Sequence, residues 1–223
     1  MSEQYDATLL MSEFVTHNVK RFVVTKPAAF DYRPGQGVEL AIDHPDWRDE
    51  GRPFTPANLV TDNALEFVIK KYPSHNGVTE QLHQLESGAK LLLSPAFGTI
   101  AYRGPGVFLA GGAGITPFLA ILREQMREGA IGDSTLIYSN KTPDDVICEK
   151  ELRHYLGDRC VLTYTDASAP GMLQRRIDRD LLARLIDDFS QPFYVCGPPG
   201  FMEAVNQSLR DLGAEPENLI FEQ

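Results

Sequence analysis

Two patterns of apolar residues divide this chain. From Tyr5 to about Arg103, short runs rich in β-branched and aromatic residues follow one another at close spacing, with one helical segment among them. After Gly104, short apolar runs alternate with longer segments in which apolar residues recur at helical spacing. The first pattern predicts an antiparallel β-barrel. The second predicts a doubly wound parallel sheet, an α/β arrangement with helices on its faces.

The turn Gly104-Pro105-Gly106 separates the two patterns and predicts a domain boundary, with one domain over residues 1–103 and another over 104–223. In the first domain the predicted strands are 7–15, 19–25, 38–42, 54–60, 65–72 and 91–94, and the predicted helix is 77–85. In the second domain the predicted strands are 107–110, 135–138, 161–164, 193–196 and 219–221, and the predicted helices are 116–128, 148–156, 178–189 and 201–212.

Composition excludes several classes of protein. The 223 residues carry a formal net charge of −10, which argues against nucleic acid as a general partner, because phosphate binding needs clustered Lys and Arg. No apolar run is long enough to cross a bilayer, and the N-terminus lacks the pattern of a secretory signal. The three cysteines are widely separated and predict neither disulfides nor a metal site. We therefore expect a cytoplasmic protein without membrane insertion and without a metal.

The main chemical signal is the stretch from Val107 to Leu122. A short buried strand leads into a turn with three glycines, and a helix follows. This arrangement lets the backbone approach a pyrophosphate and offers it the N-terminus of a helix. Thr116 is predicted to cap that helix, with Pro117 as its first residue. The same glycines also suit a tight strand-to-helix connection that binds nothing.

Three further motifs have two interpretations each. In Arg52-Pro-Phe-Thr55, a guanidinium, an aromatic ring and a hydroxyl on one strand suit a phosphorylated ring compound, although spacing alone favours a surface Arg beside a buried Phe. Gly77-Val-Thr79 begins a helix and is either a second phosphate-binding site or simply a helix start. Cys196 follows a strand and precedes Gly-Pro-Pro, so its thiol is either exposed beside a crevice or buried in the core.

Taken together and in order, these motifs resemble the ferredoxin–NADP reductase superfamily, especially its flavodoxin-reductase and cytochrome-b-reductase-like branches. The resemblance covers essentially the whole chain and rests on Pro34-Gly-Gln36, Arg52-Pro-Phe-Thr55, Gly77-Val-Thr79, Gly111-Gly-Ala-Gly-Ile-Thr-Pro117 and Cys196-Gly-Pro-Pro199. It implies a flavin-binding barrel followed by a pyridine-nucleotide domain. It also implies an NAD(P)H oxidoreductase that passes a hydride from nicotinamide to FAD and electrons to a separate carrier such as ferredoxin or flavodoxin.

The resemblance assigns expected roles residue by residue. The expected FAD-binding residues are Arg52, Pro53, Phe54, Thr55, Ile69, Lys70, Lys71, Tyr72, Gly77, Val78 and Thr79. The residues expected to face the dinucleotide are Gly112, Gly114, Thr116, Pro117, Asp166, Cys196, Gly197 and Pro198. Thr55 near flavin N5, Cys196 near the nicotinamide ring and Glu222 near the active site are the expected catalytic residues.

Some positions depart from the family pattern. NADP-specific relatives place a Ser-Arg pair where this chain has Tyr164-Thr-Asp166, and a carboxylate there disfavours a 2′-phosphate, so NADH is expected over NADPH. Lys141 and the pair Arg175-Arg176 could supply the opposite charge. Phe54 replaces the more usual Tyr, and the C-terminus lacks a stacking aromatic. FAD is preferred to FMN on family frequency alone.

Two alternatives keep the flavin and change the role. One is the reductase component of a multicomponent oxygenase, which differs only in its acceptor. The other is a flavin-binding regulatory subunit without turnover. A basic face for an acidic carrier could come from Lys20, Arg21, Lys26 and Arg33, although an ordinary solvated surface explains these residues as well.

Overall fold

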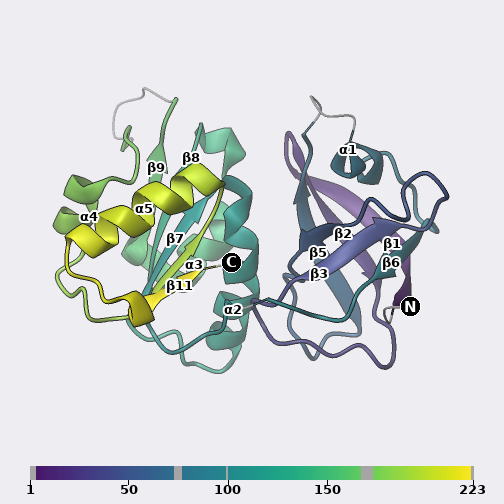
Figure 1. The fold of residues 1–223 in the computed structure, drawn as a ribbon, viewed down its shortest axis with the longest axis horizontal. Coiled ribbons are helices and arrows are strands. Elements are labelled where there is room, and N and C mark those ends of the chain that lie inside the picture. Colours follow the sequence, from purple (N-terminus) through teal and green to yellow (C-terminus); the bar gives the residue numbers. More distant parts are fainter. Residues whose placement is uncertain (1–3, 73–76, 99, 167–172, 222–223) are drawn as a thin grey trace.

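A computed structural model describes residues 4–72, 77–98, 100–166 and 173–221. Two halves lie side by side, each built on its own sheet (Figure 1). The N-terminal half carries a six-stranded antiparallel sheet and the C-terminal half a five-stranded parallel sheet, which confirms the predicted fold class. Among the helices of the described residues, none has the length and apolar character needed to cross a bilayer.

The antiparallel sheet curls around the core of the N-terminal half. Its strands follow the order β4-β3-β6-β1-β2-β5. Their bounds are β1 Tyr5–Thr16, β2 Val19–Thr25, β3 Val38–Ile42, β4 Arg52–Phe54, β5 Ala64–Lys70 and β6 Lys90–Leu93, and the helix α1 spans Val78–Leu82. Along β2 the buried residues Phe22 and Val24 alternate with more exposed ones, as expected for a strand with one face on a core.

The parallel sheet is covered on both faces. Its order is β11-β10-β7-β8-β9, with strands β7 Val107–Gly111, β8 Thr135–Asn140, β9 Cys160–Tyr164, β10 Phe193–Cys196 and β11 Leu219–Phe221. The helices are α2 Thr116–Arg127, α3 Glu149–Leu156, α4 Arg179–Leu185 and α5 Pro199–Asp211. Residues of α2 and α3 pack on one face and residues of α4 and α5 on the other. The strand order reverses beside β7, so a crevice is expected beyond the carboxyl ends of β7 and β10.

The structure corrects several local predictions. The helix expected over 178–189 ends at Leu185, and the helix expected over 77–85 ends at Leu82. The strand expected over 54–60 ends at Phe54, because the side chain of Asn58 then holds a tight loop by donating to the carbonyls of Leu59 and Ala64 and accepting from the amide of Glu66. Thr116 is not the N-cap of α2. Residues Gly112–Ile115 form a 3₁₀ turn that runs straight into the helix, so the hydroxyl of Thr116 donates back to the carbonyl of Ala113.

The two halves share one apolar cluster. The barrel residues Val19, Ala57, Val68 and Ile100 belong to the same buried cluster as Phe118 and its neighbours on α2. Gly35 lies at this junction in a left-handed conformation, with φ +90°, and a Cβ there would come within 2.0 Å of the Ile100 carbonyl oxygen. The tight contact therefore requires glycine at this position.

We predict that Phe118→Ala lowers the free energy of unfolding by about 3–5 kcal/mol, because a fully buried ring is lost and a cavity remains. Urea unfolding followed by circular dichroism measures this loss. Leu185→Ala is the control, since Leu185 is 39% exposed and its truncation should cost much less. A Phe118 variant as stable as that control would contradict the packing described here.

Candidate functional site

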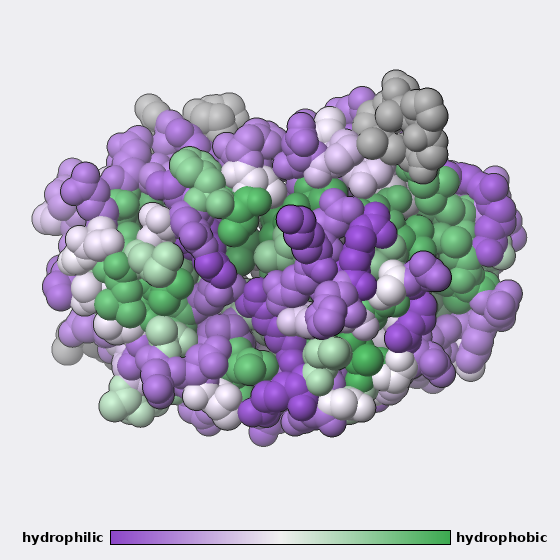
Figure 2. Space-filling view, turned by 180° about the vertical axis from the view of Figure 1, so that it is seen from behind, coloured by the Kyte–Doolittle hydropathy of each residue, from purple (hydrophilic) through white to green (hydrophobic). Residues whose placement is uncertain are grey.

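A cleft of about 1420 Å³ lies between the two halves. Its barrel side consists of the β1–β2 turn, with His17 and Asn18, and of the three residues Lys70, Lys71 and Tyr72 at the end of β5. Its other side consists of the segments that follow β7, β8, β9 and β10. In space-filling view from behind, the outline of the molecule dips between the halves (Figure 2). The cleft therefore occupies the crevice that the strand order of the parallel sheet predicts.

The glycine turn after β7 lines this cleft and has room for a ligand. Gly112 has φ +53°, and a Cβ built on it meets no atom within 4 Å. Its carbonyl accepts a hydrogen bond of 2.9 Å from the hydroxyl of the fully buried Tyr138, which fixes the turn. At Gly114 a Cβ would come within 2.3 Å of the Cys196 carbonyl oxygen. These two glycines let the turn after β7 touch the turn after β10 while leaving open space above Gly112.

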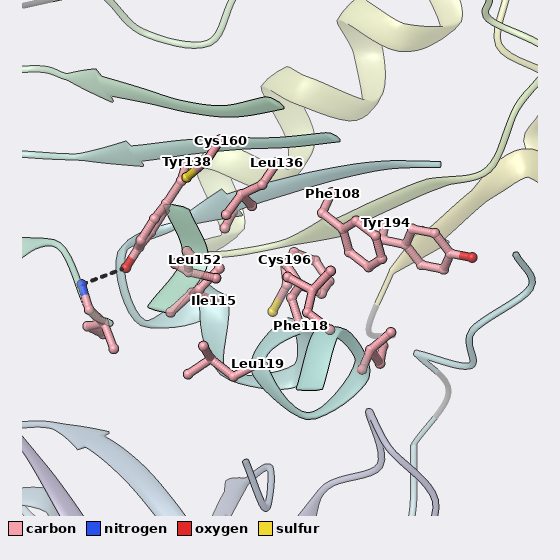
Figure 3. Close-up of a cluster of buried hydrophobic side chains, with 14 of the residues drawn as sticks. Phe108, Ile115, Phe118, Leu119, Leu136, Tyr138, Leu152, Cys160, Tyr194 and Cys196 are labelled. Atoms are coloured by element: carbon pink, nitrogen blue, oxygen red, sulfur yellow. Dashed lines mark hydrogen bonds between the residues drawn. The ribbon is translucent and has the colours of Figure 1, made fainter. Parts of the chain in front are cut away.

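Cys196 borders the cleft from within the core. It is 8% exposed and belongs to the buried cluster that contains Ile115 and Phe118 (Figure 3). Of the two interpretations of its sequence, the structure supports the buried residue, because α2 packs directly against the end of β10. Gly197 and Pro198 continue the same turn and line the cleft.

Asn140 is a residue of the cleft that sequence reasoning missed. It ends β8, is 5% exposed, and both polar atoms of its amide are buried beside the Tyr138 hydroxyl. Buried polar groups are usually paired, and the neighbouring Tyr138 hydroxyl, which also donates to the Gly112 carbonyl, links this amide to the glycine turn. The signal in the sequence was only its place at the carboxyl end of a parallel strand.

Charged groups of both signs line the same cleft. Lys141, Asp144 and Asp166 lie on the sheet side, and the amide of Asp166 donates to the Lys141 carbonyl. Asp145 is also bonded by the amide and hydroxyl of Thr142, and one of its oxygens lies 3.9 Å from both His17 Nε2 and Lys70 Nζ on the barrel. Arg175 instead donates to Asp178, the N-cap of α4.

The Arg52-Pro-Phe-Thr55 motif lies on and just after β4, outside the residues that line this cleft. Arg52 and Pro53 are exposed, and Phe54 and Thr55 are half-buried. The guanidinium of Arg52 is bonded to Glu50 at 3.2 Å and to the Gly51 carbonyl at 2.8 Å. These contacts are local and exposed, so they leave the guanidinium able to turn toward an anion.

The expected second phosphate-binding site lies at the start of α1. Gly77 is the N-cap and no side chain caps the helix, so its first N–H groups have no side-chain acceptor. The side chains of Ile69 and Val78 are buried in the barrel core, which leaves only their main-chain atoms for a ligand. Glu222 lies outside the described residues.

Three of the four basic residues considered for a docking face, Lys20, Arg21 and Lys26, contact nearby groups of the barrel, whereas Arg33 is exposed. Lys20 donates to the His83 carbonyl at 2.8 Å, Lys26 donates to the Val60 carbonyl at 2.5 Å, and Arg21 pairs with Glu13. These contacts are those of an ordinary solvated surface, and the basic docking face stays a prediction. Burial lowers the pKa of the neighbouring His83, whose Nε2 lies 2.9 Å from the Ile69 carbonyl.

Two protein-family models match this chain, one after the other. Residues 6–102 match the family described as the oxidoreductase FAD-binding domain, and residues 108–207 match the oxidoreductase NAD-binding domain. The protein is therefore an oxidoreductase of the class that joins these two domains. With both domains in this order and on this fold, the chain belongs to the ferredoxin–NADP reductase superfamily.

Several relatives are named as reductases. The reductase component of the naphthalene 1,2-dioxygenase system of Pseudomonas putida is 26% identical over 221 residues, which cover 95% of this chain and 66% of the relative. NADH-cytochrome b5 reductase 1 of Coccidioides immitis is 29% identical over 231 residues, which cover 92% of this chain and 74% of the relative. The chain spans less than two thirds of the length of the dioxygenase relative and of several others.

Solved structures show the same fold. The FAD/NAD-binding domain of a nitric oxide dioxygenase from Vibrio cholerae superposes with a TM-score of 0.85 at 24% identity, covering 97% of each chain. A ferredoxin NADP⁺ reductase from Neisseria gonorrhoeae gives a TM-score of 0.81 at 21% identity, covering 100% of this chain and 99% of that one.

The two cleft glycines should respond differently to the same substitution. We predict that Gly114→Ala lowers the free energy of unfolding by about 2–3 kcal/mol, because its Cβ meets the Cys196 backbone. Gly112→Ala should cost only about 1 kcal/mol, the strain of a left-handed alanine, because its Cβ enters open space. Thermal and urea unfolding measure both losses, and equal losses would contradict the geometry of the turn.

Proposed function

We propose that the protein is an FAD-dependent NAD(P)H oxidoreductase that delivers electrons to a separate redox carrier. One observation carries the proposal: the cleft is shared between an FAD-binding half and an NAD-binding half, with Lys70, Lys71 and Tyr72 on one side and the glycine turn and Cys196 on the other. A flavin held by the barrel and a nicotinamide held by the sheet would meet in such a cleft. The proposed domains are residues 1–103 and 104–223, joined where the hydroxyl of Tyr194 bonds both Arg103 and Gly104.

On the barrel side we assign the flavin to three sets of groups. The guanidinium of Arg52 would fork onto the pyrophosphate, Phe54 would pack near the ring system, and the Thr55 hydroxyl would hydrogen-bond near N5. Ile69 to Tyr72 and Gly77 to Thr79 would line the ribityl and phosphate path with main-chain N–H groups and lysine charge. When bound, FAD supplies the chemistry of taking up a hydride from a nicotinamide and releasing electrons to an acceptor.

On the sheet side the chain orients the dinucleotide. The main chain at Gly112 and Gly114, with Thr116 and Pro117 starting the helix behind them, would face the dinucleotide. Cys196, Gly197 and Pro198 would border the nicotinamide ring. The catalytic contribution of these residues is position: they hold the reacting rings together, and no side chain is required as an acid or base.

We propose NADH as the preferred nucleotide and a small redox protein as the acceptor. Asp166 is exposed at the cleft, where its carboxylate would accept from a ribose 2′-hydroxyl and repel a 2′-phosphate. The second candidate acceptor is the oxygenase of a multicomponent system, which the naphthalene dioxygenase and propane monooxygenase relatives favour.

An anaerobic titration tests the function. The purified protein is loaded with FAD and titrated with NADH and then NADPH while the visible flavin band is recorded. We expect either nucleotide to bleach the band, with NADH effective at lower concentration. A flavin-loaded protein that neither nucleotide bleaches would contradict the enzyme and favour the non-catalytic flavin-binding subunit. A protein that takes up no flavin would overturn the barrel assignment.

Asp166→Ser should shift the nucleotide preference. Removing the carboxylate removes its repulsion of a 2′-phosphate, so the ratio of kcat/KM for NADPH to that for NADH should rise about tenfold, which corresponds to about 1.4 kcal/mol. Steady-state kinetics with an artificial acceptor measures the ratio. Asp144→Ser is the matched control, because Asp144 is an exposed carboxylate in the same cleft. An unchanged ratio in the Asp166 variant would contradict the assignment.

A further inference from the structure

Arg123 on α2 makes the most extensive ionic contact between the two halves in the described part of the chain. Its side chain is 15% exposed. Within the sheet half, its Nε and Nη2 donate to the two oxygens of Glu151 on α3, at 2.6 and 2.9 Å. Toward the barrel, its Nη1 donates to the Ala57 carbonyl and to Glu66 Oε1 on β5, each at 2.7 Å. One guanidinium therefore joins two helices of one half to two segments of the other.

The partners of Arg123 are themselves held in place. The hydroxyl of Tyr155 donates to Glu151 at 2.9 Å, and the amide of Ala57 donates to the Glu66 carbonyl at 2.7 Å. Burial opposes the charge on Arg123, but its bonds to Glu151 and Glu66 outweigh burial and raise its pKa. The same contact overcomes the burial of Glu151 and lowers the pKa of that carboxyl. Short bidentate hydrogen bonds between partners that are themselves held in place fix the relative orientation of the segments that carry them.

The segments that Arg123 joins are those that lead to the cleft. Its helix, α2, continues directly from the glycine turn at Gly112–Ile115. Ala57 follows Thr55 closely in the chain, and β5 ends at Lys70, where the barrel wall of the cleft begins. Elsewhere across the cleft, Asp145 approaches His17 and Lys70 only at 3.9 Å, and His17 is 58% exposed. Of these ionic contacts, only the Arg123 contact is short enough to set the spacing of the halves.

We propose that Arg123 is a positioning residue that sets the distance between the flavin-binding strands and the nucleotide-binding turn. The proposal rests on the proposed function and deepens it. Hydride transfer needs the reacting atoms about 3–3.5 Å apart, and a misplacement of about 1 Å can cost about 10²-fold in rate. Arg123 touches neither of the proposed nucleotide and flavin sites, so its loss should slow the transfer without weakening the binding of either ligand.

The test compares Arg123→Gln with Arg153→Gln in the FAD-loaded protein. Arg153 lies on α3, is 50% exposed and pairs with Glu149 of its own helix, so it controls for loss of an arginine in the same half. Anaerobic stopped-flow with increasing NADH gives the limiting rate of flavin reduction and the Kd of NADH. For Arg123→Gln we expect the limiting rate to fall about tenfold or more while the Kd stays within about twofold. Arg153→Gln should change neither.

Further variants separate positioning from stability. Arg123→Lys keeps the charge but loses the two-pronged contact, so it should restore only part of the rate. If Arg123→Gln does not fold, Glu66→Gln weakens the contact from the barrel side and leaves Glu151 bound to Arg123. It should also lower the limiting rate at unchanged Kd. An unchanged limiting rate in a folded Arg123→Gln protein, or a fall explained by a weaker Kd, would overturn the proposal.

A second readout distinguishes failure of this inference from failure of the proposed function. Amide hydrogen exchange of the protein without nucleotide should rise over residues 56–68 and over α2 in Arg123→Gln but not in Arg153→Gln. If neither nucleotide reduces the flavin of the wild-type protein, the proposed function fails. Increased exchange in the Arg123 variant alone would still support the role of Arg123 in holding the two halves in place. Equal exchange in the two variants would overturn the proposed role of Arg123.

Discussion

The packing of α2 against the barrel is the contact on which the rest of the molecule depends. Phe118 and its neighbours form one buried cluster with Val19, Ala57, Val68 and Ile100, so the two halves share a core rather than meeting through water. Without that contact, two small domains on a short linker would move independently. With it, the carboxyl ends of β7 and β10 face the end of β5 across a cleft, and two ligand-binding walls become a single site.

Two glycines then shape the cleft, and the ionic contact of Arg123 aligns its two walls. Gly114 allows the turns after β7 and β10 to touch, and Gly112 leaves open space where a pyrophosphate can approach the main chain. The apolar cluster holds the halves together by burying surface, which is not a directional interaction. Arg123 adds direction, since its bonds to Glu151, Glu66 and Ala57 require one alignment of helix and strands. Affinity between the halves and their alignment thus come from different interactions.

The fold could be predicted from the sequence because its signals are local. Apolar runs, glycine turns and the break at Gly104 lie within short windows, and the fold class and family they indicated are confirmed. The error at Thr116 arose because Thr followed by Pro suits a helix start, whereas the helical turn already begins at Gly112 in a 3₁₀ turn. Arg123 gave no signal, because its importance depends on partners far away in the chain, and Asn140 gave only its place at the end of a strand. The roles of individual cofactor-binding residues stay predictions.

The most direct test of the account is a single turnover of the FAD-loaded protein with NADH that carries deuterium at the transferred position of the nicotinamide. Rapid mixing without oxygen records the flavin band, and the protium and deuterium forms are compared. If the cleft brings the nicotinamide and the flavin together, the band bleaches in one turnover and does so more slowly with deuterium. A flavin band that does not bleach with either form, in a protein that binds both ligands, would contradict the account.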